Sequence, residues 1–134
     1  MLTRPVHLIG AGGHARVVVD ALLCLDMDRN DIALWSEDEA QVGKEVAELV
    51  VRLLERGALQ NQAFHLCIGD NQARERLFDA LCSVEAFPKI IIHPRATIAS
   101  DAGIEAGAFV AAGAVIAPNA TVGKATIVNH GAIV

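Results

Sequence analysis

Short apolar runs alternate with helical patterns over the first two thirds of the sequence. The run at 6–9 ends at a glycine cluster, and beyond it apolar residues recur on one helix face, at Val17, Val18, Ala21, Leu22 and Leu25. Further strands are predicted at 32–35, 63–68 and 89–92, and further helices at 42–54 and 73–81. Strands that alternate with helices predict a parallel sheet with helices on its faces.

From Ile92 the helical spacing gives way to a period of six residues. Each repeat begins with Ile or Val, at Ile92, Ile98, Ile104, Val110, Ile116, Val122, Val128 and Val134. The fourth residue after each of the first seven is small: Ala96, Ala102, Ala108, Ala114, Ala120, Thr126 and Ala132. β-Branched residues fill the interior of a parallel β-helix and small residues fit its corners, so this period predicts a solenoid.

Known solenoids with six-residue repeats are left-handed and place three repeats in each triangular coil, so this chain holds about two and a third coils. The chain stops at Val134, the leading residue of an eighth repeat, with no cap after it. An uncapped solenoid exposes apolar surface and strand edges, so we expect the sequence to be part of a longer protein.

The expected fold is therefore α/β and has two parts. A small Rossmann-like domain with a parallel sheet is expected at 1–90, followed at 91–134 by the start of a left-handed parallel β-helix of hexapeptide repeats, truncated at its C-terminus. In open parallel sheets, ligands bind beyond the carboxyl ends of the strands. Three of these ends carry distinctive residues, at 10–14, 36–37 and 69–70, and we expect them to converge on one crevice.

The glycine loop at 10–15 fits the pattern G-x-G-x-x-G/A between a strand and a helix. Gly12 and Gly13 let backbone N–H groups approach a phosphate, and the helix N-terminus adds partial positive charge. The alternative is a tight turn without a ligand. A dinucleotide would need two mononucleotide halves, and the chain has room for one, so a mononucleotide or nucleotide-sugar is favoured over NAD.

Other candidate binding residues follow the same strand ends. His14, in the first helical turn, is expected to donate a hydrogen bond to the ligand or to be a solvated helix-start residue. Ser36 and Glu37 are candidates for the ribose or base. Asp70, after Gly69, can accept from the nucleoside or cap the next helix. Arg74 and Arg76 are expected to be solvated helix charges.

Composition excludes several other classes of protein. The formal net charge of −5 argues against nucleic acid as a partner. Cys24, Cys67 and Cys82 form no CxxC pair, so they are expected to be buried, reduced thiols, and no metal site is predicted. The sequence has neither an apolar run long enough to span a membrane nor a signal peptide, so a cytoplasmic location is expected.

Taken together, the whole chain resembles the NeuD/PglD-like sugar O-/N-acyltransferases. Four segments carry the resemblance: Gly10-Ala11-Gly12-Gly13-His14, Ile68-Gly69-Asp70-Asn71, Ile91-Ile92-His93-Pro94 and Val128-Asn129-His130-Gly131-Ala132-Ile133-Val134. The family usually has paired aspartates after the second strand. This chain has Trp35-Ser36-Glu37-Asp38 instead, which leaves the ribose or base contact open.

The resemblance implies a trimeric enzyme that transfers acetyl from acetyl-CoA to a nucleotide-linked amino sugar or a sialic-acid-type sugar. Gly12, Gly13 and His14 match the family's phosphate-side loop, and Gly69 and Asp70 match its second nucleotide contact. The family's catalytic histidine falls just after the position of Val134, so no catalytic residue is expected within this chain. His130 matches a turn position ahead of that histidine. The acetyl-CoA groove belongs to later coils.

Two other functions remain as alternatives. One is a non-catalytic nucleotide-binding module that uses the β-helix for trimerisation only. The other is a hexapeptide-repeat metalloenzyme of the carbonic-anhydrase type, which needs histidines clustered between subunits. Only His93 and His130 lie in the repeats, and the metalloenzyme would leave the glycine loop unexplained.

Overall fold

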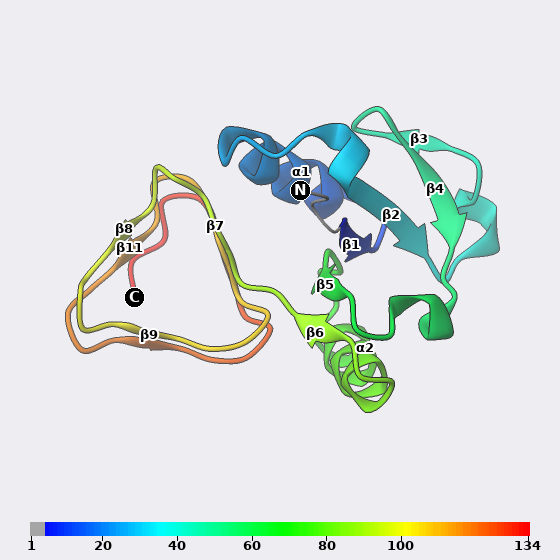
Figure 1. Cartoon of the computed structure of the whole chain (residues 1–134). Coiled ribbons are helices and arrows are strands. Elements are labelled where there is room, and N and C mark those ends of the chain that lie inside the picture. The colour runs from blue at the N-terminus through cyan, green and yellow to red at the C-terminus, as the bar shows by residue number, and fades with distance from the viewer. Residues whose placement is uncertain (1–4) are drawn as a thin grey trace.

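The computed structural model describes residues 5–134, and Figure 1 shows a sheet flanked by helices beside a triangular coil. The sheet has six strands in the order β3-β4-β2-β1-β5-β6. Their bounds are β1 Val6–Ile9, β2 Ile32–Ser36, β3 Glu45–Val46, β4 Leu49–Leu53, β5 Ala63–Leu66 and β6 Phe87–Pro88. All neighbours are parallel except β3 and β4, so the predicted parallel sheet is confirmed.

Two α-helices cover the sheet, α1 (Gly13–Cys24) and α2 (Asn71–Ser83). Val18 and Leu22 of α1 pack with Leu8 of β1, whereas Leu77 of α2 packs with Ile9. Because Leu8 and Ile9 are adjacent and point to opposite faces of β1, the two helices lie on opposite faces of the sheet. Three single 3-10 turns, at Arg29–Asp31, Glu39–Gln41 and Arg56–Leu59, complete this unit.

The predicted helix at 42–54 is wrong, because the segment forms an antiparallel hairpin of β3 and β4. Leu49 and Val51 are buried whereas Val50 is 55% exposed, which is the alternation of a strand. The turn places Ala47 and Glu48 at φ of 51° and 66°, in the left-handed region. Two-residue hairpin turns with positive φ usually contain Asn or Gly, and this turn has neither.

The fourth strand predicted at 89–92 is misplaced, because the sheet strand there ends at Pro88 and only Ile91 and Ile92 are in a strand, which belongs to the coil. β6 (Phe87–Pro88) ends the sheet, and β7 (Ile91–Ile92) already belongs to the coil. The two residues between them, Lys89 and Ile90, form the whole connection.

The six-residue period forms a parallel β-helix, as predicted. Its strands are β7 Ile91–Ile92, β8 Thr97–Ile98, β9 Gly103–Ile104, β10 Phe109–Val110, β11 Val115–Ile116, β12 Thr121–Val122 and β13 Ile127–Val128. Phe109 pairs with Ile91 and with Ile127, one coil away on each side. The leading residues of the repeats, among them Val110, Ile116 and Val122, form the interior cluster.

One face of the β-helix is covered by the sheet unit. Strands β7, β10 and β13 form this face, and their outward side chains are Ile91, Phe109 and Ile127. Ile91 and Phe109 are each 1% exposed, and they belong to the same core cluster as Val18 and Leu22 of α1. The apolar core on the α1 side of the sheet therefore continues onto the outer face of the coil, whereas the coil interior forms a cluster of its own.

The cysteines differ from one another in burial. Cys67 is buried, as predicted, but Cys82 is half-buried and Cys24 is exposed at the end of α1. The prediction of three buried thiols is wrong for Cys24, which is not among the residues of α1 that pack into the core: Ala15, Val18, Val19, Ala21 and Leu22. No helix within residues 5–134 is both long and apolar enough to cross a membrane.

Gly10 is the position in the glycine loop where the fold itself requires glycine. Its φ is +115°, and a Cβ there would lie 2.7 Å from the carbonyl oxygen of Cys67 and 2.8 Å from Cγ1 of Ile68. By contrast, a Cβ on Gly12 or Gly13 meets nothing within 4 Å. The tight approach of β1 to the end of β5 therefore depends on Gly10, and the other two glycines are open to a neighbouring molecule.

We predict that Gly10→Ala lowers the free energy of unfolding by about 2 kcal/mol or more, because it combines backbone strain with a clash against main chain. Gly13→Ala is the matched control, because Gly13 opens α1 and its Cβ would lie in open space. It should change stability by less than about 1 kcal/mol. Urea unfolding of both variants measures the difference, and equal midpoints would contradict the steric argument.

Candidate nucleotide site

The candidate site begins at the turn between β1 and α1. The backbone N–H of Gly10 donates to the carbonyl of Trp35 at 2.8 Å, and that of Cys67 donates to Ile9 at 2.7 Å. These bonds fix the loop between the ends of β2 and β5. Gly12 is the N-cap of α1 in an extended conformation and supplies no side-chain cap, and the first turn has no acidic residue. The first N–H groups of α1 therefore point outward without a side-chain acceptor, as an anion requires.

A cavity of about 340 Å³ lies beside this helix start. Its lining residues come from three places: His14 of α1, then Gly69, Asn71 and Arg74 around the start of α2, and finally Ile127 and Asn129 of the β-helix. The structure thus brings His14 and Gly69 together, as the sequence predicted. The walls contributed by Ile127 and Asn129 were not predicted, because no local pattern reveals which coil face meets the sheet unit.

His14 is half-buried, and its ring meets Phe109 edge to face, with centroids 5.2 Å apart. Its Nε2 atom is buried without a hydrogen-bond partner. Burial lowers the pKa of His14, and the charges of Arg74 and His130 lower it further. His14 is therefore a neutral group at neutral pH, which can offer a hydrogen bond to a ligand but no ionic attraction.

A second histidine lies under the same aromatic ring. His65 of β5 is 1% exposed and approaches Phe109 with ring centroids 5.9 Å apart. Its Nδ1 lies 2.8 Å from the carbonyl oxygen of Lys89, so Nδ1 donates and Nε2 is the unprotonated nitrogen. Burial lowers the pKa of His65 to about 4. The junction of sheet and coil therefore contains two neutral histidines.

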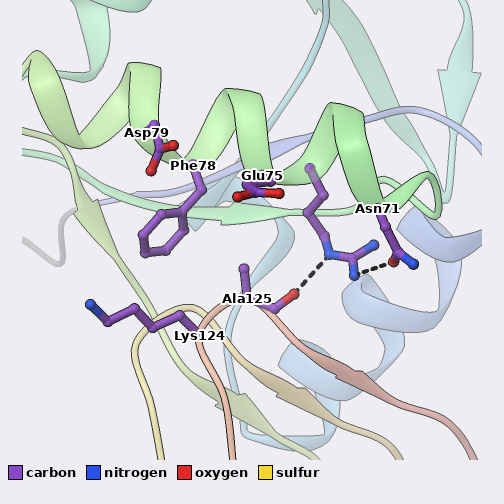
Figure 2. A pocket seen from close by; sticks show the side chains of 7 residues that line it. Asn71, Glu75, Phe78, Asp79, Lys124 and Ala125 are labelled. Atoms are coloured by element: carbon purple, nitrogen blue, oxygen red, sulfur yellow. Dashed lines mark hydrogen bonds between the residues drawn. The ribbon is translucent and has the colours of Figure 1, made fainter.

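Arg74 is bonded on several sides, which corrects the expectation of a solvated charge. Its Nε donates to the carbonyl of Ala125 in the β-helix at 2.7 Å, as the dashed lines of Figure 2 illustrate together with the bond to Asn71. Further bonds reach the carbonyls of Ile68 and Gly69. Arg76 follows the expectation more closely, because it is exposed and pairs with Glu37 at 2.9 Å.

Ser36 and Glu37 do not line the cavity beside His14. Ser36 is buried, and its Oγ accepts from the backbone N–H of Asp38 at 3.0 Å. Glu37 lies between Arg76 and Arg56, at 2.9 and 3.5 Å. The hydrogen bond from Arg76 is the main cause that lowers the pKa of Glu37. A ribose hydroxyl at Glu37 would have to share this carboxylate with two guanidinium groups.

Asp70 acts as the N-cap of α2, one of the two roles predicted for it. Its Oδ2 accepts from the backbone N–H of Ala73 at 2.8 Å. The carboxylate is exposed, and its other oxygen is open to a ligand. His130 is exposed in the turn after β13, next in sequence to Asn129 of the cavity wall, and its charge contributes to lowering the pKa of His14.

One group of side chains within the described residues has the spacing of metal ligands. Single ligand atoms of Asp20, Cys24 and His93 lie within 4.8 Å of one another. However, Nδ1 of His93 accepts from the backbone N–H of Arg95 at 3.0 Å, so in the neutral ring Nε2 carries the hydrogen. This N–H faces Asp20 at 3.9 Å. A metal needs a lone pair there, so the chemistry of this group does not fit a metal.

A family model for the PglD N-terminal domain matches residues 5–81, which is more than half of the chain. The chain belongs to the PglD N-terminal domain family. The match covers the glycine loop, all of β1 to β5 and most of α2. The predicted resemblance to PglD-like sugar acyltransferases is therefore confirmed.

Solved structures extend the likeness of this PglD-family chain into its β-helix. A mutant of perosamine N-acetyltransferase from Caulobacter crescentus, in complex with CoA and GDP-perosamine, is 27% identical with a TM-score of 0.85. The acetyltransferase domain of PglB from Neisseria gonorrhoeae, in complex with acetyl coenzyme A, is 25% identical with a TM-score of 0.82. The alignments cover 99% of this chain but only 63% and 65% of the other two. No curated protein sequence gives a significant match.

The neutral state of His65 predicts a pH dependence of folding in this PglD-family chain. Its pKa is about 4 in the folded protein and 6.5 in the unfolded chain, so between these values the unfolded state binds more protons. Stability should therefore rise with pH through this window, and acidification from pH 6.5 to 4 should cost roughly 3 kcal/mol from this residue. His7 and His14, whose pKa values are also lowered, add to the same slope.

His65→Gln tests this assignment, because glutamine can donate to the carbonyl of Lys89 but does not titrate. Urea unfolding at several pH values from 4.5 to about 7.5 should give a flatter slope for the variant, whatever its absolute stability. An unchanged slope would mean that His65 is not the buried neutral group.

Proposed function

We propose that this chain is the nucleotide-sugar-binding part of an acetyl-CoA-dependent acetyltransferase that acts on a nucleotide-linked amino sugar. The observation that carries the proposal is the cavity beside His14, because the start of α1, the start of α2 and the β-helix all supply its walls. One of the similar structures holds CoA and GDP-perosamine, and another holds acetyl coenzyme A, which supports this chemistry. A sialic-acid-type sugar is the alternative acceptor.

The phosphates of the substrate would lie against the first N–H groups of α1. Gly12 and Gly13 leave this approach open, since a Cβ on either would meet nothing within 4 Å. The partial positive charge of the helix N-terminus favours the anion, and His14 adds a neutral hydrogen-bonding group. Gly69 and Asp70 would make the second contact, while Ser36 and Glu37 remain candidates for the nucleoside end.

The sugar would then extend toward the β-helix, where Ile127 and Asn129 form the far wall. In this proposal residues 1–90 bind the nucleotide and residues 91–134 begin the β-helix on which transfer occurs. The general base would be a histidine beyond Val134, which takes the proton from the amine or hydroxyl as its nitrogen or oxygen bonds to the acetyl carbon. The thioester C–S bond then breaks, and CoA leaves as its thiol. Acetyl-CoA is the co-substrate, and neither a metal nor a nucleic acid takes part.

The exposed free thiol of Cys24 suits a reducing compartment such as the cytoplasm.

We predict that a UDP-, GDP- or CMP-sugar raises the melting temperature of this chain. At about a hundred times its dissociation constant the ligand should add roughly 2.7 kcal/mol, a shift of several degrees for a chain of this size. Gly13→Val should keep the fold, since its side chain points into open space, but lose the shift. NAD is the control ligand. A shift with NAD alone, or with nothing, would contradict the proposal.

We also propose that the chain assembles as a homotrimer through the β-helix. Of the three faces, the one with β7, β10 and β13 is covered by the sheet unit. The face with β9 and β12 presents Gly103 and Thr121, which are small. The face with β8 and β11 presents Val115, which is 37% exposed and forms a parallel bridge to Ile133, 78% exposed. This apolar face is the one suited to a second copy.

Val115→Arg should therefore shift the chain from trimer to monomer, because burying an unpaired charge in an interface costs several kcal/mol, on the order of 3. Thr121→Arg, on the neighbouring face, is the matched control and should leave assembly unchanged. Sedimentation velocity measures the oligomeric state of the wild-type chain and of both variants. A monomeric wild-type chain, or a trimer that survives Val115→Arg but not Thr121→Arg, would refute the assignment of this face.

A further inference from the structure

Arg74, near the start of α2, donates four hydrogen bonds through its guanidinium group. A guanidinium has five N–H groups. Nε donates to Ala125, one terminal nitrogen donates to Ile68 at 2.9 Å and Gly69 at 3.2 Å, and the other donates to Asn71 at 2.8 Å. Three of the four acceptors are backbone carbonyls. These acceptors remain when the side chains of their residues are substituted, so the bonds depend on Arg74 itself.

These bonds join two segments that are far apart in sequence. Ile68 and Gly69 form the loop after β5, which the proposed function assigns to the nucleotide-sugar. Ala125 lies 51 residues from Arg74, in the turn between β12 and β13. It holds φ of 53°, in the left-handed region, and its own N–H donates to Ala106 at 2.9 Å. The bond from Arg74 therefore stabilises a turn that an alanine adopts only under strain.

The turn at Ala125 sets the position of the far wall of the cavity. Ile127 and Asn129, which form that wall, follow Ala125 by two and four residues. Arg74 itself lines this cavity and also a second one of about 400 Å³, between α2 and the turn at Lys124 and Ala125, which Figure 2 shows. In that view Glu75, Phe78 and Asp79 of α2 face Lys124 and Ala125 of the coil.

We propose that Arg74 is the positioning residue that sets the nucleotide loop against the β-helix and transmits ligand binding from one to the other. The proposal rests on the proposed function for the identity of the ligand, but not for the link itself. The charge alone does not explain the link, because Arg76, two residues on, carries the same charge and directs its guanidinium to Glu37. What matters is the planar fork, which reaches the loop and the coil at once.

Lysine at this position offers a point charge on a flexible stem and cannot hold four acceptors in one plane. Arg74→Lys therefore keeps the charge and removes the geometry, whereas Arg76→Ala is the matched control that loses an ion pair on the same helix. Arg74→Ala is the stronger variant, and Arg74→Lys still decides the matter where Arg74→Ala fails to fold.

The first measurement is amide hydrogen exchange of the ligand-free chain. We expect exchange at residues 124–129 to be about tenfold faster in Arg74→Lys than in the wild type, with the sheet strands unchanged. Arg76→Ala should exchange like the wild type at 124–129. Equal exchange in Arg74→Lys and the wild type, or equally faster exchange in both variants, would overturn the proposal.

The second measurement adds UDP-N-acetylglucosamine, GDP-mannose or CMP-N-acetylneuraminate, whichever raises the melting temperature of the wild type. In the wild type and in Arg76→Ala the ligand should slow exchange at 10–15, 68–71 and 124–129. Because Arg74 lines the cavity, Arg74→Lys is expected to bind the ligand more weakly, so each variant is compared at saturating ligand. Under these conditions the ligand should protect the two loops of Arg74→Lys but not its coil. If the ligand still slows exchange at 124–129 in Arg74→Lys, the proposal that Arg74 transmits ligand binding to the coil is wrong. If no sugar nucleotide binds the wild type, the proposed function fails, while the ligand-free comparison still tests the link.

Discussion

The apolar ladder of Ile91, Phe109 and Ile127 is the constraint on which the rest of the structure depends. A β-helix repeats the same position every coil, so an outward apolar residue in one repeat becomes a stripe along one face. Two members of this stripe are almost wholly buried against the core of α1. Burial of one Phe and one Ile stabilises the junction by about 3–6 kcal/mol before entropy is counted. The sheet unit is thereby held to a single face of the coil, and the cavity beside His14 forms where the two meet.

The same ladder sets the electrostatics of the junction. Phe109 contacts the rings of both His14 and His65, and the apolar surroundings favour the neutral form of each. A charged pair there would repel and would also lose hydration, so a stable junction and two neutral histidines come from one cause. The positively charged group at the site is then Arg74, and most of its N–H groups are already directed to backbone carbonyls.

The sequence predicted those features that repeat or that depend on local pattern. The period of six specified the β-helix, and the run at 6–9 with its glycines specified β1 and the start of α1. The hairpin at 45–53 was missed because Ala47 and Glu48 adopt left-handed conformations that their side chains do not signal. The sequence predicts a solvated charge at Arg74, because no local pattern reveals an acceptor that is a main-chain carbonyl 51 residues away, at Ala125. The sequence predicts that His14 and Gly69 lie together, and they do because β1 and β5 are neighbours, but it does not reveal that Glu37 pairs with two arginines.

An acidic chain can still hold an anion at this site, because the attraction is local and comes from oriented N–H groups. A net charge of −5 acts over the whole surface and is screened within about 10 Å, whereas helix N–H groups act at contact distance. With His14 neutral and Arg74 bonded to the backbone, recognition at this cavity depends on hydrogen-bond geometry more than on total charge. A free phosphate would find few unpaired charges here. A larger ligand that meets α1, α2 and the coil together would contact all three walls, which supports the proposed sugar nucleotide over a simple anion.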